Sequence, residues 1–114
     1  MKKEFPCPCC GYVTFSGPPG TFETCPVCFW TDDDLQLAYP NLVGGANKVS
    51  LIEGQRNFRN FGASEKRLLE YVKKPTSEYI KCSEWRILDE INDKYLDWNN
   101  KKRDELWMQN KIWN

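Results

Sequence analysis

Four cysteines near the start of the chain have the type and spacing of a metal-binding site. They form two pairs, Cys7 with Cys10 and Cys25 with Cys28, and two residues separate the cysteines of each pair. A Cys-x-x-Cys turn brings two thiolates to one ion, and two such turns supply the four soft ligands that Zn²⁺ binds at tetrahedral corners. The spacing therefore predicts a structural zinc site in the first quarter of the chain.

The residues around each pair favour tight turns of the same kind. Pro8 and Pro26 follow the first cysteine of each pair and stiffen the turn. Gly11 follows the first turn and can take a positive φ at no steric cost. Phe29 has the same place after the second turn, where a positive φ costs a non-glycine residue about 1 kcal/mol or more. Phe29 therefore either adopts another conformation or packs well enough to offset that cost.

Two further cysteines stand outside the pairs. Cys9 lies between Cys7 and Cys10, and a Cys7–Cys9 pair would be tighter. We prefer Cys7 and Cys10, because their spacing repeats that of the second pair and Gly11 follows directly. Cys9 is then a non-ligand thiol close to the metal. Cys82 is distant in sequence, and we interpret it as a small buried hydrophobe.

Two alternatives to zinc use the same cysteines. Two disulfides are disfavoured, because no secretory signal peptide is evident and the thiols are unevenly arranged. Iron also accepts four thiolates, and residues 7–30 resemble a shortened rubredoxin. Rubredoxins are acidic and end soon after the second turn, whereas this chain is neutral and continues. A rubredoxin-like electron-transfer protein is therefore the second alternative.

Composition argues against catalysis. The 114 residues include no histidine, so the usual general base is missing. A zinc ion held by four cysteines also has no open position for water or substrate, which is the mark of a structural site. We therefore predict that the protein is not an enzyme and that it has no catalytic residues.

Charge and hydropathy restrict the partners. The 16 basic residues equal the 16 acidic ones, and this balance disfavours a dedicated nucleic-acid binder. A nucleic-acid-binding zinc ribbon with a local basic patch is the first alternative, and its candidate residues are Lys48, Arg56, Arg59, Lys66 and Arg67. No apolar run is long enough to span a membrane. We expect a cytoplasmic protein, since thiols stay reduced there.

The elements that position the cysteines are short. Residues 12–15 and 21–24 are β-prone, and a Gly/Pro turn joins them. This pattern predicts an antiparallel hairpin tied at both ends by cysteine turns, which is a zinc ribbon. An isolated hairpin is marginal in water, so the metal must supply much of the folding free energy, roughly 10 kcal/mol in zinc peptides.

Helices are predicted to follow the ribbon. Three aspartates come after Thr31, and they indicate a helix capped by Thr31 or Asp32 rather than a Ca²⁺ or Mg²⁺ site. Ser50 and Glu53 form a capping box that opens a second helix, which Gly62 ends. A shorter helix is expected between Gly62 and the Lys-Lys-Pro sequence that follows it.

The longest helix is predicted from Ser83 onward, because Ile87, Ile91 and Tyr95 recur at helical spacing. An apolar patch near the end of the chain either packs on the same chain or serves a protein partner or self-association; its residues are Leu106, Trp107, Met108, Ile112 and Trp113. The predicted fold is thus α+β. Residues 1–75 form a zinc ribbon with short helices, and residues 76–114 form a helical extension packed on it.

Three motifs in order resemble the bacterial cysteine-rich CPCC proteins over about residues 5–65. They are Cys7-Pro8-Cys9-Cys10-Gly11, then Cys25-Pro26-Val27-Cys28-Phe29-Trp30, then Gly44-Gly45-Ala46-Asn47 with Ser50-Leu51 and Asn57-Phe58. Phe29 departs from the expected glycine. The resemblance implies a small bacterial protein with a zinc-ribbon-like N-terminus, and it implies no reaction. We therefore predict a zinc-binding protein-interaction module, of which an immunity or antitoxin-type protein is one form.

Overall fold

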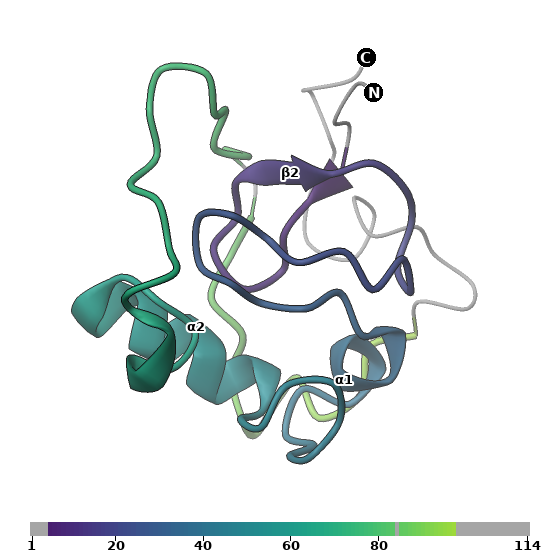
Figure 1. Cartoon of the computed structure of the whole chain (residues 1–114). Coiled ribbons are helices and arrows are strands. Elements are labelled where there is room, and N and C mark those ends of the chain that lie inside the picture. Colours follow the sequence, from purple (N-terminus) through teal and green to yellow (C-terminus); the bar gives the residue numbers. More distant parts are fainter. Residues whose placement is uncertain (1–4, 84, 98–114) are drawn as a thin grey trace.

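Two short strands, two α-helices and a 3₁₀ helix make up the regular structure of residues 5–83 and 85–97, the part of the chain that the computed structural model describes. In chain order they are β1 (Phe5–Pro6), β2 (Val13–Phe15), α1 (Asp34–Ala38), α2 (Leu51–Phe61) and the 3₁₀ helix η1 (Lys66–Leu68). The hairpin lies on one side of the core and the two α-helices on the other (Figure 1). The predicted α+β class is confirmed.

The antiparallel hairpin is present, but its strands differ from the prediction. β2 pairs with β1, in the register Phe5 with Phe15 and Pro6 with Val13, and not with residues 21–24. The reason is local, since the first cysteine turn brings its own flanking residues together. Residues 21–24 pair instead with the residues after the second cysteine turn, through a bridge between Thr24 and Thr31. Each cysteine turn therefore closes its own small hairpin.

A distant segment runs along the other side of β2. The N–H of Val13 donates to the carbonyl of Ile80, and the N–H of Cys82 donates to the carbonyl of Gly11, both at 2.8 Å. An antiparallel bridge joins Tyr12 to Lys81 between them. Residues 80–82 thus form an edge beside the first cysteine turn.

Asp33 caps α1, so the expectation that Thr31 or Asp32 would cap it is wrong. The Asp33 carboxylate accepts hydrogen bonds from the N–H groups of Leu35 and Gln36. Asp32 is not available as a cap, because its buried carboxylate accepts hydrogen bonds from the backbone and hydroxyl of Thr21. The aspartates serve separate local hydrogen bonds, as the capping interpretation requires.

The loop between the helices is tied to α1 by buried amides. The side chain of Gln36 donates to the carbonyls of Leu42, Asn47 and Val49 and accepts from the N–H of Asn47. Gly45 leaves room for this network, since a Cβ there would lie 2.6 Å from the Asp33 carboxylate and 2.8 Å from the Gln36 amide carbon. The Gly-Gly-Ala-Asn motif therefore has a structural role here.

The boundaries predicted for the second helix are confirmed. The Ser50 hydroxyl accepts a hydrogen bond from the N–H of Glu53 at 3.1 Å. Gly62 ends α2 in the left-handed conformation with φ of 95°, and its N–H donates to the carbonyl of Phe58. The first two turns bury Leu51 and Gln55, and Leu51 belongs to the same core cluster as the cysteines, so this helix forms one wall of the core.

The helix predicted after Gly62 is mostly absent. Only η1 is helical, and turns follow it up to residue 71. The chain then turns toward the second cysteine pair, where the N–H of Lys73 donates to the carbonyl of Pro26 at 2.9 Å. A longer helix would carry this segment away from that contact.

The helix predicted from Ser83 is wrong for the described residues 85–97, which are irregular. The Asp89 carboxylate accepts hydrogen bonds from the N–H groups of Ile91 and Asn92, and Asp93 accepts from the N–H of Asp89. Side-chain bonds of this kind offer the backbone an alternative to a helix. Arg86 also forms an ion pair with Asp93 at 2.8 Å, which closes the same loop.

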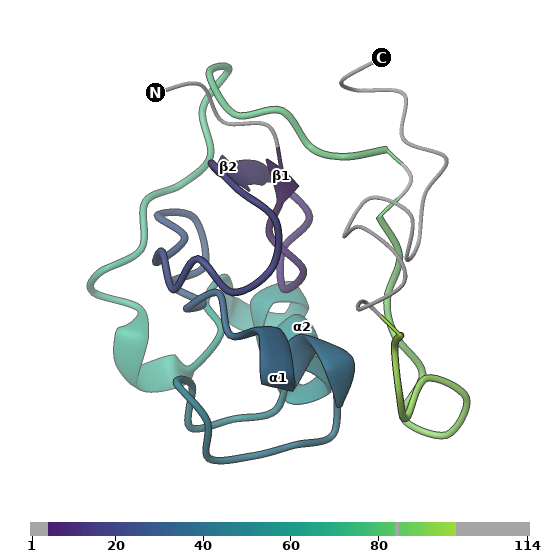
Figure 2. The ribbon, with the colours of Figure 1, turned by 90° about the vertical axis from the view of Figure 1, so that its right-hand side faces the viewer.

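This irregular segment lies beside α1 and α2 (Figure 2, yellow-green). Leu88 and Leu96 are buried. The apolar residues whose spacing predicted a helix are exposed instead, with Ile91 at 70% and Tyr95 at 51%. The N–H of Leu96 donates to the carbonyl of Ala38 at 2.7 Å. The predicted apolar patch in residues 106–113 lies outside the described residues, and the division at residue 75 stays a prediction.

Candidate metal centre

The structure brings Cys7, Cys10, Cys25 and Cys28 together at the centre of the core. The Sγ atoms of Cys7 and Cys28 are 3.6 Å apart, and those of Cys10 and Cys25 are 3.7 Å apart. All four Sγ atoms lie within 4.8 Å of one another, and all four side chains are buried. A disulfide bond would need about 2.05 Å between sulfurs. The cysteines are therefore free thiols, and the disulfide alternative is excluded for this structure.

The sulfur positions fit a tetrahedral metal ion. A metal–sulfur bond of about 2.3 Å places the corners of a tetrahedron about 3.8 Å apart. The Cys7–Cys28 and Cys10–Cys25 separations of 3.6 and 3.7 Å are close to this value. Four sulfurs suit zinc and iron equally, so the donor set indicates a metal site without selecting the metal.

The two cysteine turns have matching backbone geometry. The N–H of Gly11 donates to the carbonyl of Cys7 at 2.8 Å, and the N–H of Phe29 donates to the carbonyl of Cys25 at 2.7 Å. Gly11 has φ of 83° and Phe29 has φ of 67°. The Phe29 ring stacks on Tyr71 with centroids 5.4 Å apart. Of the two possibilities for Phe29, the structure shows the strained conformation with a packed ring.

Ionisation of the four thiols is uneven. Burial raises the pKa of Cys7, Cys10 and Cys28 well above the ordinary value. Burial also opposes ionisation of Cys25, but hydrogen bonds from the other three thiols and from Thr14 outweigh it and lower the Cys25 pKa well below that value. The Thr14 hydroxyl lies 3.2 Å from the Cys25 Sγ. The cluster thus favours one thiolate, and a dication would favour all four.

Cys9 and Cys82 are buried but are not among the clustered thiols. Cys9 packs against α2 where that helix carries Gly54, since a Cβ at Gly54 would lie 3.2 Å from both the Cys9 Sγ and the Trp30 ring. This is the place expected for a non-ligand thiol near the metal. A glycine inside a helix costs stability relative to alanine, and the close approach of Cys9 and Trp30 explains it here.

Two residues that the sequence did not single out support the first cysteine turn. The carbonyl of Pro8 accepts a hydrogen bond from the Trp85 indole at 2.8 Å and another from the Gln55 amide at 2.9 Å. The Trp85 ring lies flat against Gly11, where a Cβ would come within 2.8 Å of it. Gln55 also accepts from the N–H of Leu88. These contacts join segments far apart in sequence, so no local pattern could reveal them.

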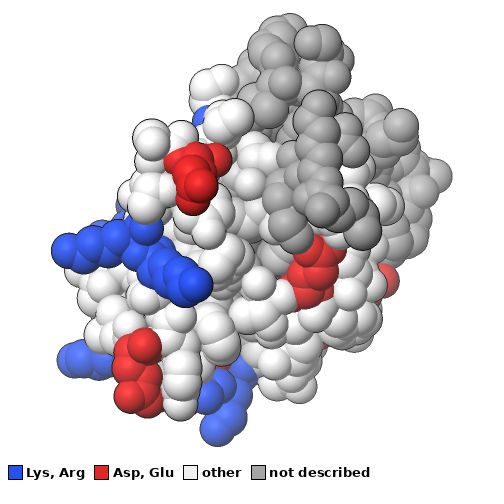
Figure 3. Space-filling view, turned by 45° about the horizontal axis from the view of Figure 1, so that its top comes forward, with Lys and Arg blue, Asp and Glu red and all other residues white. Residues whose placement is uncertain are grey.

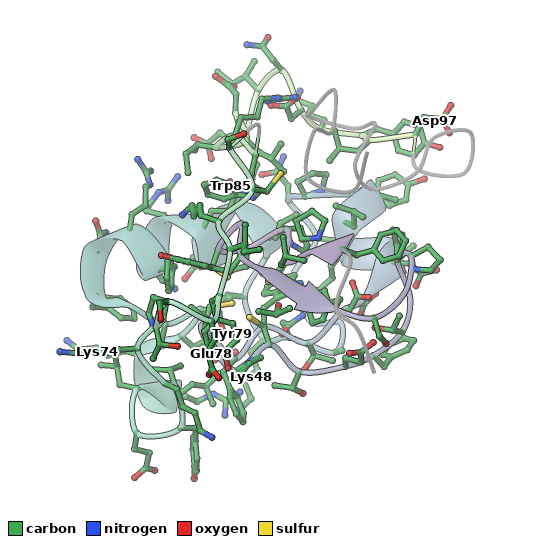
Figure 4. All side chains as sticks on the ribbon, turned by 90° about the horizontal axis from the view of Figure 1, so that it is seen from above. Lys48, Lys74, Glu78, Tyr79, Trp85 and Asp97 are labelled. Atoms are coloured by element: carbon green, nitrogen blue, oxygen red, sulfur yellow. The ribbon has the colours of Figure 1, made fainter. Side chains whose placement is uncertain are left out.

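A cation also lies above the first cysteine turn. The Lys81 ammonium is 4.9 Å from the Tyr12 ring centroid, 4.8 Å from that of Trp85 and 5.9 Å from that of Phe58. Distances of this size allow cation–π attraction. Lys81 therefore helps to hold the edge segment and the Trp85 ring (labelled in Figure 4) beside the first cysteine turn.

The basic residues predicted for a nucleic-acid surface are all exposed, on and around α2 and η1: Lys48, Arg56, Arg59, Lys66 and Arg67. Arg67 is paired with Glu65 at 2.7 Å, which reduces its availability. Lys and Arg side chains gather on the left of Figure 3, the side of α2 and the segment after it, with single acidic side chains among them.

Comparison with known protein families identifies the family of this chain. None of the curated proteins matches the chain. In the described part of the chain, no helix has both the length and the apolar character needed to cross a membrane. The family model for Cysteine-rich CPCC matches residues 5–79, which extends the expected range past residue 65 into the segment that contacts the second cysteine turn. Because this match covers most of the chain, the protein belongs to the Cysteine-rich CPCC family.

Proposed function

We propose that this is a small bacterial protein that binds zinc, has no enzymatic activity and binds another protein. Its ligands to one structural Zn²⁺ are Cys7, Cys10, Cys25 and Cys28. The observation that carries the proposal is the set of four buried Sγ atoms within 4.8 Å of one another. Zinc is preferred to iron because the chain is neutral and continues well beyond the second pair, unlike the rubredoxins.

The metal is the first part to test. Elemental analysis of the purified protein should find one zinc per chain, and the solution should be colourless. One iron per chain, with visible thiolate-to-iron absorption, would replace this proposal with rubredoxin-like electron transfer.

The ligand set is tested by a matched pair of variants. Cys10→Ser should lose zinc and fold together, because the remaining three thiols leave the site open. Cys9→Ser should keep one zinc per chain, because Cys9 is not among the clustered thiols. Zinc retained in Cys10→Ser but lost in Cys9→Ser would show that the assignment is wrong.

The donor set supports a binding role rather than catalysis. Four thiolates leave no open coordination position, and the chain has no histidine to act as a general base. We therefore place the function on surfaces that the metal holds in shape, in a cytoplasmic protein of which the immunity or antitoxin type is one form. Co-expression with the products of neighbouring genes, followed by size-exclusion chromatography, tests this role. A stable complex would support it, and no complex with any of them would count against it.

Nucleic-acid binding is the second candidate, because the five basic residues around α2 and η1 are exposed. Fluorescence polarisation with a labelled DNA duplex and with a labelled RNA tests nucleic-acid binding against the proposed protein-binding function. Tight binding at low salt that weakens steeply with added salt would favour nucleic acid. No binding at low salt would remove this candidate.

A further inference from the structure

A small apolar cavity opens beside the second cysteine turn. Its volume is about 290 Å³, and its walls include Phe58 and Phe61 from α2 and Leu69 and Val72 from the segment after η1. Val27, the residue before the last cysteine of the metal site, also lines the cavity and is itself 1% exposed. The shape of this cavity, here called the knuckle pocket, therefore depends on the metal site.

The mouth of the knuckle pocket is basic. Lys73 and Lys74 line it together with the apolar residues, and both side chains are exposed. Neither lysine has an ion pair with another residue in the described part of the chain. The hydrogen bond from the Lys73 N–H to Pro26 fixes their backbone to the second cysteine turn. Figure 4 shows the Lys74 side chain pointing outward, well apart from Lys48.

The charges of the chain are segregated around this site. Residues 5–47 contain four acidic residues and no Lys or Arg, whereas residues 48–81 contain eight Lys or Arg and four acidic residues. Although the net charge of the chain is zero, residues 48–81 are therefore basic, and they include the segment that lines the pocket. A partner that docks here should carry negative charge, since complementary charge favours encounter and excludes wrong partners.

We propose that the knuckle pocket binds a bulky apolar side chain of an acidic segment in the partner protein. This inference rests on the proposed function, because it names the surface and the chemistry of that partner. The cavity volume is at the low end for a small-molecule site, which suits one anchoring side chain. Buried apolar anchors surrounded by charge are typical of binding hot spots. An apolar cavity gives no advantage to a phosphate backbone, so the observations favour a peptide over nucleic acid.

The test uses the full zinc-loaded protein, labelled with ¹⁵N, and the acetylated, amidated peptide Glu-Glu-Phe-Glu-Glu. Amide signals of Val27, Leu69 and Val72 should shift on titration. The same peptide with serine in place of phenylalanine should bind at least tenfold more weakly, because it lacks the anchor. The doubly substituted Lys73→Glu/Lys74→Glu protein should lose roughly tenfold in affinity, and the Lys48→Glu control, which changes a lysine outside the pocket, should lose less than twofold.

Three results would overturn the inference. They are the absence of shifts around the pocket, equal binding of the serine peptide, and equal weakening by Lys48→Glu. A DNA duplex that shifts the same amides at lower concentration than the phenylalanine peptide would assign the surface to nucleic acid instead. If the pocket fails while a neighbouring gene product still forms a complex, the proposed function stands with another surface. Failure of zinc binding is detected separately by elemental analysis.

Discussion

At the scale of single residues, the first cysteine turn depends on the absence of one methyl group. Gly11 has a positive φ, and its Cα faces the Trp85 ring so closely that a Cβ would lie 2.8 Å from it. Gly44 has nearly the same φ, 85°, but a Cβ there would meet nothing within 4 Å. Substituting each glycine by alanine therefore distinguishes the cost of a positive φ, which both share, from the cost of crowding, which applies only at Gly11.

Gly11→Ala should destabilise the zinc-loaded protein much more than Gly44→Ala. Gly44→Ala adds only the cost of a positive φ, about 1 kcal/mol. Gly11→Ala adds the same cost and also displaces the Trp85 ring from its hydrogen bond to Pro8, for a total of about 3 kcal/mol. Urea unfolding of both variants measures the difference. Equal losses would mean that Trp85 can move away without cost.

The uneven ionisation of the thiols predicts how many protons the metal displaces. Hydrogen bonds from the neighbouring thiols and from Thr14 lower the Cys25 pKa well below the ordinary thiol value, whereas burial raises the pKa of Cys7, Cys10 and Cys28 well above it and favours their protonated form. Zinc binding should therefore release about three protons, and affinity should fall steeply as pH falls because protons compete for the sulfurs. Calorimetry in buffers of different ionisation enthalpy counts them. Release of four protons would show that Cys25 is also protonated before zinc binds.

Thr14 provides the control for that count. Its hydroxyl donates to the Cys25 sulfur, so Thr14→Val should raise the Cys25 pKa and move the count toward four. The valine side chain keeps a similar shape and removes only the donor. An unchanged count in this variant would assign the low pKa to the neighbouring thiols alone.

At the scale of elements, α2 links the two ends of the described chain through one side chain. Gln55 is 1% exposed, donates to the carbonyl of Pro8 and accepts from the N–H of Leu88. The helix thus holds the first cysteine turn and the irregular segment at the same point.

Gln55→Ala should lower the free energy of unfolding by about 2–4 kcal/mol, because a cavity and unpaired buried groups remain. Urea unfolding checks this cost, with Asn60→Ala on the exposed face of α2 as a control that should change stability by less than about 0.5 kcal/mol.

The same contact explains which parts of the fold could be predicted. The two cysteine turns, the Ser50 cap and the Gly62 stop depend on residues a few positions apart, and the sequence predicts each of them. The partner of β2 was predicted wrongly, because the cysteine turn itself closes the hairpin. The helix from Ser83 was also wrong over residues 85–97, because Asp89 and Asp93 bind the backbone there and Leu88 reaches Gln55. Periodicity does not register hydrogen bonds of that kind.

The candidate site likewise has a part that the sequence predicts and a part that it does not. Spacing identified the four clustered cysteines and placed Cys9 outside them. Trp85 and Gln55 were missed as supports of the first turn, since both reach Pro8 from more than 40 residues away. The only available signals were a polar residue on the buried face of a predicted helix and a tryptophan without an assigned partner. Neither signal points to a particular carbonyl.

At the scale of the whole molecule, the metal site and the hydrophobic core are the same cluster. The four clustered cysteines pack with Trp30, Leu37 and Leu51, and the strands beside them are only two and three residues long. Hydrogen bonds tie the outer segments to this centre, from Lys73 to Pro26 and from Leu96 to Ala38. We therefore expect one cooperative unit rather than a metal-bound ribbon with an independent helical part.

Removal of the metal should unfold that unit as a whole. Structural zinc contributes about 10–16 kcal/mol in zinc-finger peptides, which is comparable to or larger than the whole stability of a typical domain, about 5–15 kcal/mol. As a chelator removes zinc, the ¹⁵N amide signals of Cys25, Gln55 and Leu96 should disappear together, and added zinc should restore them together. These three residues report on the cysteine turn, on α2 and on the irregular segment. Persistence of the Gln55 signal after zinc is gone would show that α2 packs without the metal.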